Sequence, residues 1–110
     1  MVFEMPKYLY EVRYTAEGAK GLAHDGGSGR RAAIAKMVEG LGGKLEAFYY
    51  ALGENDLYVI VDAPDNVSAA TASLTVNQGG GATVKTVALL TPEEMDAVGK
   101  KAVQYRPPGR

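Results

Sequence analysis

Two apolar segments joined by a very short polar break constrain the fold of this chain more than any other feature. Residues 44–52 and 56–61 are rich in aromatic and β-branched side chains, and Gly53-Glu54-Asn55 lies between them. Glycine and asparagine are typical turn residues, so the pattern predicts a β-hairpin. The second strand of this hairpin is apolar at consecutive positions, which indicates a strand that is covered on both faces and lies inside a sheet.

The rest of the chain supplies two further strands and three helical regions. Residues 8–14 alternate in polarity, so the tyrosines of this strand share one face. Alternation likewise places Leu45 with Tyr49 on one face of the first hairpin strand and Tyr50 on the other. The helix after the hairpin carries a stripe formed by Val67, Ala70 and Leu74. In chain order we expect a strand over 8–14, a short helical turn over 16–22, a helix from 29 or 30 to 41, strands over 44–52 and 56–62, a helix over 67–77, a strand over 82–90 and a helix from 92 to 103.

Capping residues mark the beginnings of the helices. The clearest is the run Thr91-Pro92-Glu93-Glu94, a capping box with proline at the first helical position. Ser28 lies near the end of the glycine-rich segment 24–29, which predicts a break in helical structure followed by a helix capped by Ser28. The other expected caps are Thr15 and either Asp65 or Asn66.

The order of elements predicts an α+β fold of the ferredoxin-like type. A βαββαβ order with right-handed crossovers gives a four-stranded antiparallel sheet with the first and third strands in its centre. The first two helices then cover one face of the sheet, and an additional C-terminal helix follows. The opposite face is left apolar, with the C-terminal helix able to cover only part of it. We therefore expect a homodimer through the sheet face, with higher oligomers as a further option.

Length and composition bound the class of protein. The 110 residues form a single expected domain, 1–110, with a core over about 7–103 and a lead-in over 1–6. A net charge of −1 gives no electrostatic footprint for nucleic acid, and no apolar run is long enough to cross a membrane. The chain has no cysteine, and its N-terminus has no secretory pattern, so we expect a cytoplasmic protein. Neither a metal nor a cofactor is expected.

Several stretches, in order, resemble the GYD domain family. They span about residues 8–96 and are Tyr14-Thr15 with Gly18, Arg30-Arg31, Leu41-Gly42-Gly43, Ala47-Phe48-Tyr49-Tyr50, Gly53-Glu54-Asn55-Asp56, residues 59–65 and residues 90–94. The resemblance implies a dimeric α+β barrel, in which two ferredoxin-like subunits pack sheet to sheet. It implies no particular biochemical function. Where the family usually has an aromatic residue before the aspartate, this chain has Asn55, so no role of that aromatic residue is carried over.

Two classes of function fit these observations. The first is a binding or assembly module, with a small anionic or planar ligand held by Tyr14, Arg30, Arg31 and Tyr50. The alternative is a small cofactor-free enzyme, similar to a monooxygenase or an isomerase. In that case His24, the only histidine, would be the catalytic base near the cleft between the first helix and the sheet. A surface position for His24 and packing roles for the tyrosines are the simpler interpretations.

Overall fold

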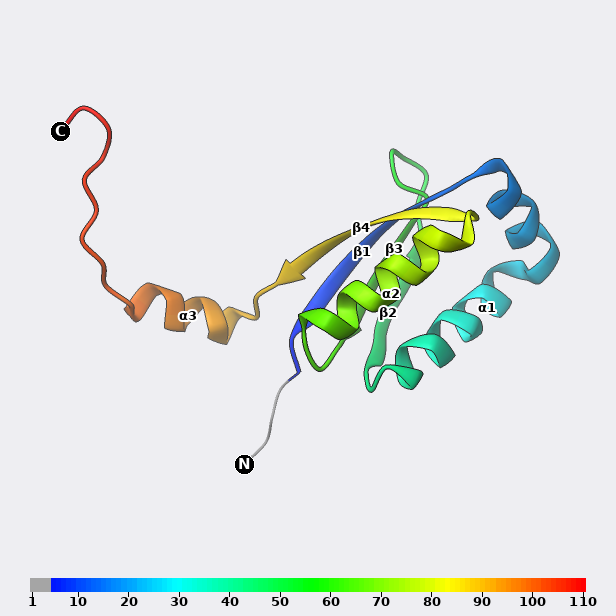
Figure 1. The fold of residues 1–110 in the computed structure, drawn as a ribbon, viewed down its shortest axis with the longest axis horizontal. Helices are drawn as coiled ribbons and strands as arrows, with labels where there is room; N and C mark the ends of the chain where they lie inside the picture. The colour runs from blue at the N-terminus through cyan, green and yellow to red at the C-terminus, as the bar shows by residue number, and fades with distance from the viewer. Residues whose placement is uncertain (1–4) are drawn as a thin grey trace.

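A four-stranded antiparallel sheet forms the centre of the molecule, as seen in a computed structural model (Figure 1). The structure describes residues 5–110, and residues 1–4 of the predicted lead-in lie outside this range. The elements are β1 (Lys7–Tyr14), α1 (Ala16–Gly40), β2 (Lys44–Tyr50), β3 (Leu57–Asp62), α2 (Asn66–Gly79), β4 (Ala82–Leu89) and α3 (Pro92–Lys100). The strand order is β2-β3-β1-β4, so β1 and β3 are central as predicted, and the fold is of the ferredoxin-like α+β type.

The two faces of the sheet differ in how they are covered. Helices α1 and α2 lie on one face (Figure 1), here called the covered face. The predicted tyrosine side of β1 belongs to it, and the Tyr10 hydroxyl donates a hydrogen bond of 2.8 Å to the Ala69 carbonyl in α2. The buried core of the described chain lies there and consists of Tyr8, Tyr10, Val12, Val38, Leu57, Val59, Val61, Ala63, Ala69, Ala72 and Ala82.

The glycine-rich segment 24–29 is helical except at one residue, so the break is much narrower than predicted. Helix α1 is capped by Thr15, whose hydroxyl accepts a hydrogen bond from the Gly18 amide at 3.1 Å. It continues through the glycines with one non-helical residue, Gly26, at φ 79° and ψ 159°. Such a φ is readily adopted only by glycine, so Gly26 is where the helix kinks. Ser28 is therefore not the N-cap, because helical structure resumes before it.

A bulge in β2 reverses part of the predicted strand alternation. The register with β3 shifts between Leu45 and Ala47, so that Leu45 pairs with Val61 whereas Ala47 pairs with Ile60. Leu45 is therefore on the covered face, opposite to Tyr49, with which alternation had grouped it. Tyr50 keeps its predicted place on the face opposite to Tyr49.

The predicted stripe of α2 faces solvent. Val67 is 76% exposed and Leu74 is 60% exposed, and Ala70 is exposed as well. The buried residues of this helix are Ala69 and Ala72. Small side chains let α2 pack closely on the sheet, and this close packing overrides the larger apolar residues on its outer side.

The C-terminal helix leaves the sheet uncovered. The predicted capping box is present, and the Glu94 amide donates a hydrogen bond of 3.1 Å to the Thr91 hydroxyl. However, α3 has no buried residue and extends away from the sheet (Figure 1). The radius of gyration of 17.0 Å reflects this, since a compact chain of about 100 residues has about 13 Å. The second sheet face, here called the open face, therefore keeps its apolar side chains, among them Leu9, Tyr49, Tyr58, Ile60 and Val87, uncovered.

Candidate functional site

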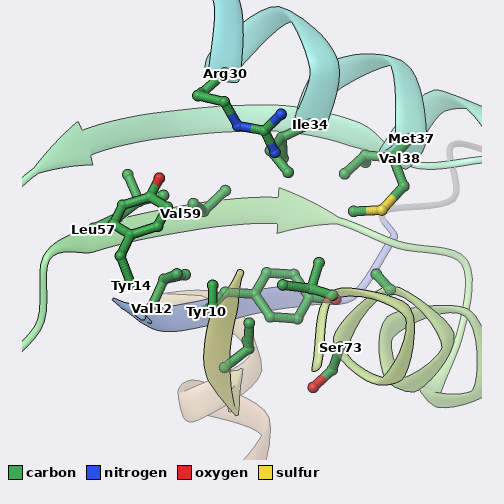
Figure 2. Close-up of a pocket in the computed structure, with 14 residues that line it drawn as sticks. Tyr10, Val12, Tyr14, Arg30, Ile34, Met37, Val38, Leu57, Val59 and Ser73 are labelled. Carbon is green, nitrogen blue, oxygen red and sulfur yellow. The ribbon is translucent and has the colours of Figure 1, made fainter. Parts of the chain in front are cut away.

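A narrow apolar cleft lies between α1, α2 and the covered face of the sheet (Figure 2). Its walls include Ile34 and Met37 from α1 and Val76 from α2, and its floor includes Val12 and Val59. The cavity volume is about 60 Å³, several times the 10–15 Å³ that one water molecule needs. The cleft can thus admit a slender apolar group.

One end of the cleft is polar. Arg30 and Tyr14 lie at this end, whereas Met37 and Val38 lie at the other (Figure 2). Arg30 extends from α1 towards the interior, and its side chain is 34% exposed. Among the residues that line the cleft, Arg30 is the charged one. A guanidinium beside an apolar surface is suited to binding a carboxylate or a phosphate, because its donors form a planar fork.

Arg30 has an acidic neighbour within its own chain. The Arg30 Nη1 atom lies 3.5 Å from the Asp25 Oδ2 atom, and the His24 Nδ1 atom lies 3.1 Å from Asp25 Oδ1. The His24 ring and, after it, Arg30 hold the pKa of Asp25 below its usual value. Asp25 therefore remains ionised at neutral pH and faces Arg30 from the solvent side of the cleft.

The turn after β2 fixes the position of Tyr14. The Asp56 side chain accepts a hydrogen bond from the Tyr14 amide at 2.8 Å, and the Asp56 amide donates to the Val12 carbonyl at 2.8 Å. Burial and the neighbouring Tyr50 raise the pKa of Tyr14 to about 12. The Tyr14 phenol is therefore neutral at pH 7 and is suited to donate a hydrogen bond rather than to act as a base.

Tyr50 connects the sheet to the kink in α1. Its hydroxyl donates a hydrogen bond of 3.1 Å to the Gly27 carbonyl, next to the kink at Gly26. A Cβ atom at position 27 would lie 3.0 Å from the Tyr50 ring, so a small residue is favoured there. Tyr50 thus holds the second segment of α1 beside the polar end of the cleft.

A second hollow adjoins this polar end. It is a groove of about 280 Å³, bordered by Asp25 and by Gly18, and it shares Tyr14 and Arg30 with the cleft. Gly18 packs directly on the turn before β4, where an added Cβ would lie 1.7 Å from the Gly81 carbonyl oxygen. Arg30 and Tyr14 therefore stand where the outer groove meets the inner apolar cleft.

The structure brings together three of the predicted site residues and separates two. Tyr14 and Arg30 line both hollows, and Tyr50 lies beside Tyr14. Arg31 is exposed and lines neither hollow. The His24 side chain is 88% exposed and lines neither hollow, although it touches Asp25. The catalytic role of His24 stays a prediction.

The sequence did not indicate the residue that positions Tyr14 or the residues of α2 that line the cleft. Asp56 reads as an ordinary turn residue, and its bond to the Tyr14 amide depends on the pairing of β1 with β3. The α2 lining, Ala72, Ser73 and Val76, was missed because Ala72 and Ser73 are small and the larger apolar residues Val67 and Leu74 indicated another helix face. Within residues 5–110 there is no group of three or more histidine, cysteine or acidic side chains that could hold a metal ion.

Comparisons with known proteins bear on the family of the chain. In the part of the chain that the structure describes, no helix is both long enough and apolar enough to cross a membrane. No curated protein and no solved structure shows a significant match. The profile of one family, described as the GYD domain, matches residues 8–98, which includes β1 to β4 and most of α3. Because this match spans most of the 110 residues, the chain belongs to the GYD domain family.

Proposed function

We propose that this protein is a homodimeric module that binds a small anionic or planar ligand in the cleft between α1, α2 and the sheet. One observation carries the proposal: Arg30, beside Tyr14, stands at the mouth of an otherwise apolar cleft. Ligand sites commonly combine an apolar lining with a few converging polar groups. The absence of cysteine agrees with a cytoplasmic location, where disulfides are rare.

The dimer part of the proposal rests on the open face. Tyr49 is 73% exposed, Val87 is 39% exposed and Tyr58 is 37% exposed, and they flank Leu9 and Ile60 on the same face. A contiguous apolar patch of this kind is typical of an interaction surface. A second copy of the chain offers a matching apolar sheet face through a two-fold axis.

Ligand binding in the cleft can be tested with a matched pair of substitutions on α1. Ile34→Trp would fill the cleft, whereas Ala33→Trp adds the same side chain at an exposed position. The probes are octanoate, 2-naphthoate and 1-octanol, and the readout is the change in backbone amide chemical shifts on titration. We expect octanoate or 2-naphthoate to shift the amides of Val59 and Val76 more than 1-octanol does, with the shifts lost in Ile34→Trp and retained in Ala33→Trp.

Two results would contradict the proposal. One is that no probe shifts these amides in the unmodified chain. The other is that both tryptophan variants retain the shifts equally, which would place binding outside the cleft. Circular dichroism and thermal unfolding of each variant would confirm that it is folded before titration.

A further inference from the structure

The geometry of the cleft points to one class of ligand, a narrow monocarboxylate. Its straight apolar chain would lie along α1 and its carboxylate would bind Arg30. This inference rests on the proposed function, because it specifies the ligand of the same cleft. It depends on three observations: the single long ion pair of Arg30, the dimensions of the apolar part, and the position of Asp25.

Within residues 5–110, Arg30 has only a distant anionic partner. A guanidinium has five N–H donors. In the described part of the chain the Arg30 side chain has one ion-pair partner, Asp25, and the contact is long at 3.5 Å. Charge-assisted hydrogen bonds to a carboxylate are much shorter, at about 2.7–2.9 Å. The fork of Arg30 is therefore available for a bidentate contact with a ligand carboxylate.

The apolar part of the cleft has the shape of a short channel. Arg30, Ile34 and Met37 follow one another along the same side of α1 and all line the cleft. Seven residues of α-helix separate the first from the last, which corresponds to about 10 Å. The volume of about 60 Å³ is less than half of the roughly 150 Å³ of an apolar cavity that binds benzene, so a fused ring system is disfavoured and only the first carbons of an unbranched chain fit directly. Met37 at the inner end is a flexible side chain, and it would have to move to admit the rest of a longer chain.

Asp25 occupies the place that a ligand carboxylate would take. It borders the outer groove next to Arg30, and its other oxygen is within 3.1 Å of His24. When a ligand binds Arg30, Asp25 can move away while keeping its contact with His24. Asp25 would therefore compete with the ligand, so that removing its charge strengthens binding.

The test compares four probes on the full chain by isothermal titration calorimetry: octanoate, butyrate, 1-octanol and 2-naphthoate. We expect octanoate to bind about tenfold or more tightly than each of the others, because it alone combines a negative charge with an unbranched chain long enough to reach from Arg30 to Met37. Arg30→Gln should remove the preference of octanoate over 1-octanol. Arg31→Gln, which changes the neighbouring exposed arginine, should leave it unchanged. Asp25→Asn should strengthen octanoate binding several-fold without changing the affinity for 1-octanol.

Several outcomes would overturn this inference. They are equal binding of octanoate and 1-octanol, tighter binding of 2-naphthoate than of octanoate, and equal effects of Arg30→Gln and Arg31→Gln. Weaker octanoate binding in Asp25→Asn would also contradict it. If 2-naphthoate binds more tightly than octanoate and Ile34→Trp blocks it, the proposed function stands and the inference alone fails. If no probe is sensitive to Ile34→Trp, both fail.

Discussion

The two faces of the sheet are built from the same strands but differ in how the rest of the chain covers them. On β3, Leu57, Val59 and Val61 are at most 3% exposed under the helices. The alternate residues Tyr58 and Ile60 lie on the open face, and Tyr58 is 37% exposed. Both sets are apolar, so hydrophobicity alone does not distinguish them. The difference lies in what the rest of the chain places above each face.

The two faces separate the stability of the monomer from its association with other chains. The covered face holds the whole buried core of the described chain, and it also contains the cleft at which Arg30 and Tyr14 meet. Within residues 5–110 no element covers the open face, since α3 extends away from it (Figure 1). Substitutions on the covered face should therefore lower the folding stability of the monomer, whereas those on the open face should weaken its self-association.

The largest effect is expected from shortening a side chain on the covered face. Leu57→Ala should lower the free energy of unfolding by about 2–5 kcal/mol, because Leu57 is 3% exposed and its removal leaves a cavity. Ile60→Ala, on the same strand but on the open face, should cost less than about 1 kcal/mol in dilute solution. Urea unfolding at low protein concentration measures both. Equal losses in the free energy of unfolding would show that the two faces contribute equally to the stability of the monomer.

A charge on the open face should break the proposed dimer. Ile60→Asp is expected to weaken self-association by about a hundredfold, because it would place an unpaired carboxylate in an apolar interface. Leu74→Asp is the matched control, since Leu74 is exposed on α2 and lies on the helical side. Sedimentation over a range of concentrations measures the association constant. A monomeric unmodified chain at micromolar concentration, or equal weakening by both variants, would contradict the sheet-face dimer.

Much of the fold was predictable because its signals are local. The hairpin, the caps Thr15, Asp65 and Thr91, and the central position of β1 and β3 all follow from short-range patterns. The bulge in β2 has no such signal, because it appears only when β2 pairs with β3. The break predicted over residues 24–29 was too wide, because helical hydrogen bonding tolerates the other glycines and only Gly26 leaves the helix.

The candidate site was predictable to a smaller extent. Arg30 and Tyr14 were identified as candidates, but residue type alone did not separate Arg30 from Arg31. The helical repeat decides this, because adjacent residues point about 100° apart around α1, so that Arg30 lines the cleft while Arg31 is exposed. The α2 side of the cleft was assigned to the wrong helix face, because Val67 and Leu74 are larger than the alanines that pack on the sheet. Close packing of small residues depends on tertiary structure.

The pH dependence of the free energy of unfolding should reveal the raised pKa of Tyr14, at the polar end of the cleft. The folded pKa of Tyr14 is about 12, above the ordinary value of about 10 in an unfolded chain. The stability from this group is therefore fully present below about pH 10 and is lost as the pH rises towards 12. Urea unfolding should show that the unmodified chain loses more stability over this window than Tyr14→Phe does. Tyr49→Phe, on the open face, should behave like the unmodified chain, and parallel curves for all three would contradict the assignment.

The smallest effect is expected from the ion pairs that cross the open face. Lys7 Nζ lies 2.8 Å from Glu46 Oε2 and 2.8 Å from Asp62 Oδ1, so one cation links β1 to both hairpin strands. These groups are partly exposed, and Lys7→Met should therefore cost less than about 1 kcal/mol, with the loss shrinking as salt is added. Lys44→Met is the matched control, since Lys44 is exposed on the same face.

This last comparison also tests whether the open face stays in water. If a second copy covers the face, the cluster of Lys7, Glu46 and Asp62 is shielded from solvent, and salt screens it less. The cost of Lys7→Met should then grow with protein concentration, while that of Lys44→Met should change less, because Lys44 forms no ion pair with residues 5–110. Urea unfolding at two protein concentrations and two salt concentrations separates the cases. A cost for Lys7→Met that is independent of protein concentration would place this end of the open face outside the dimer interface.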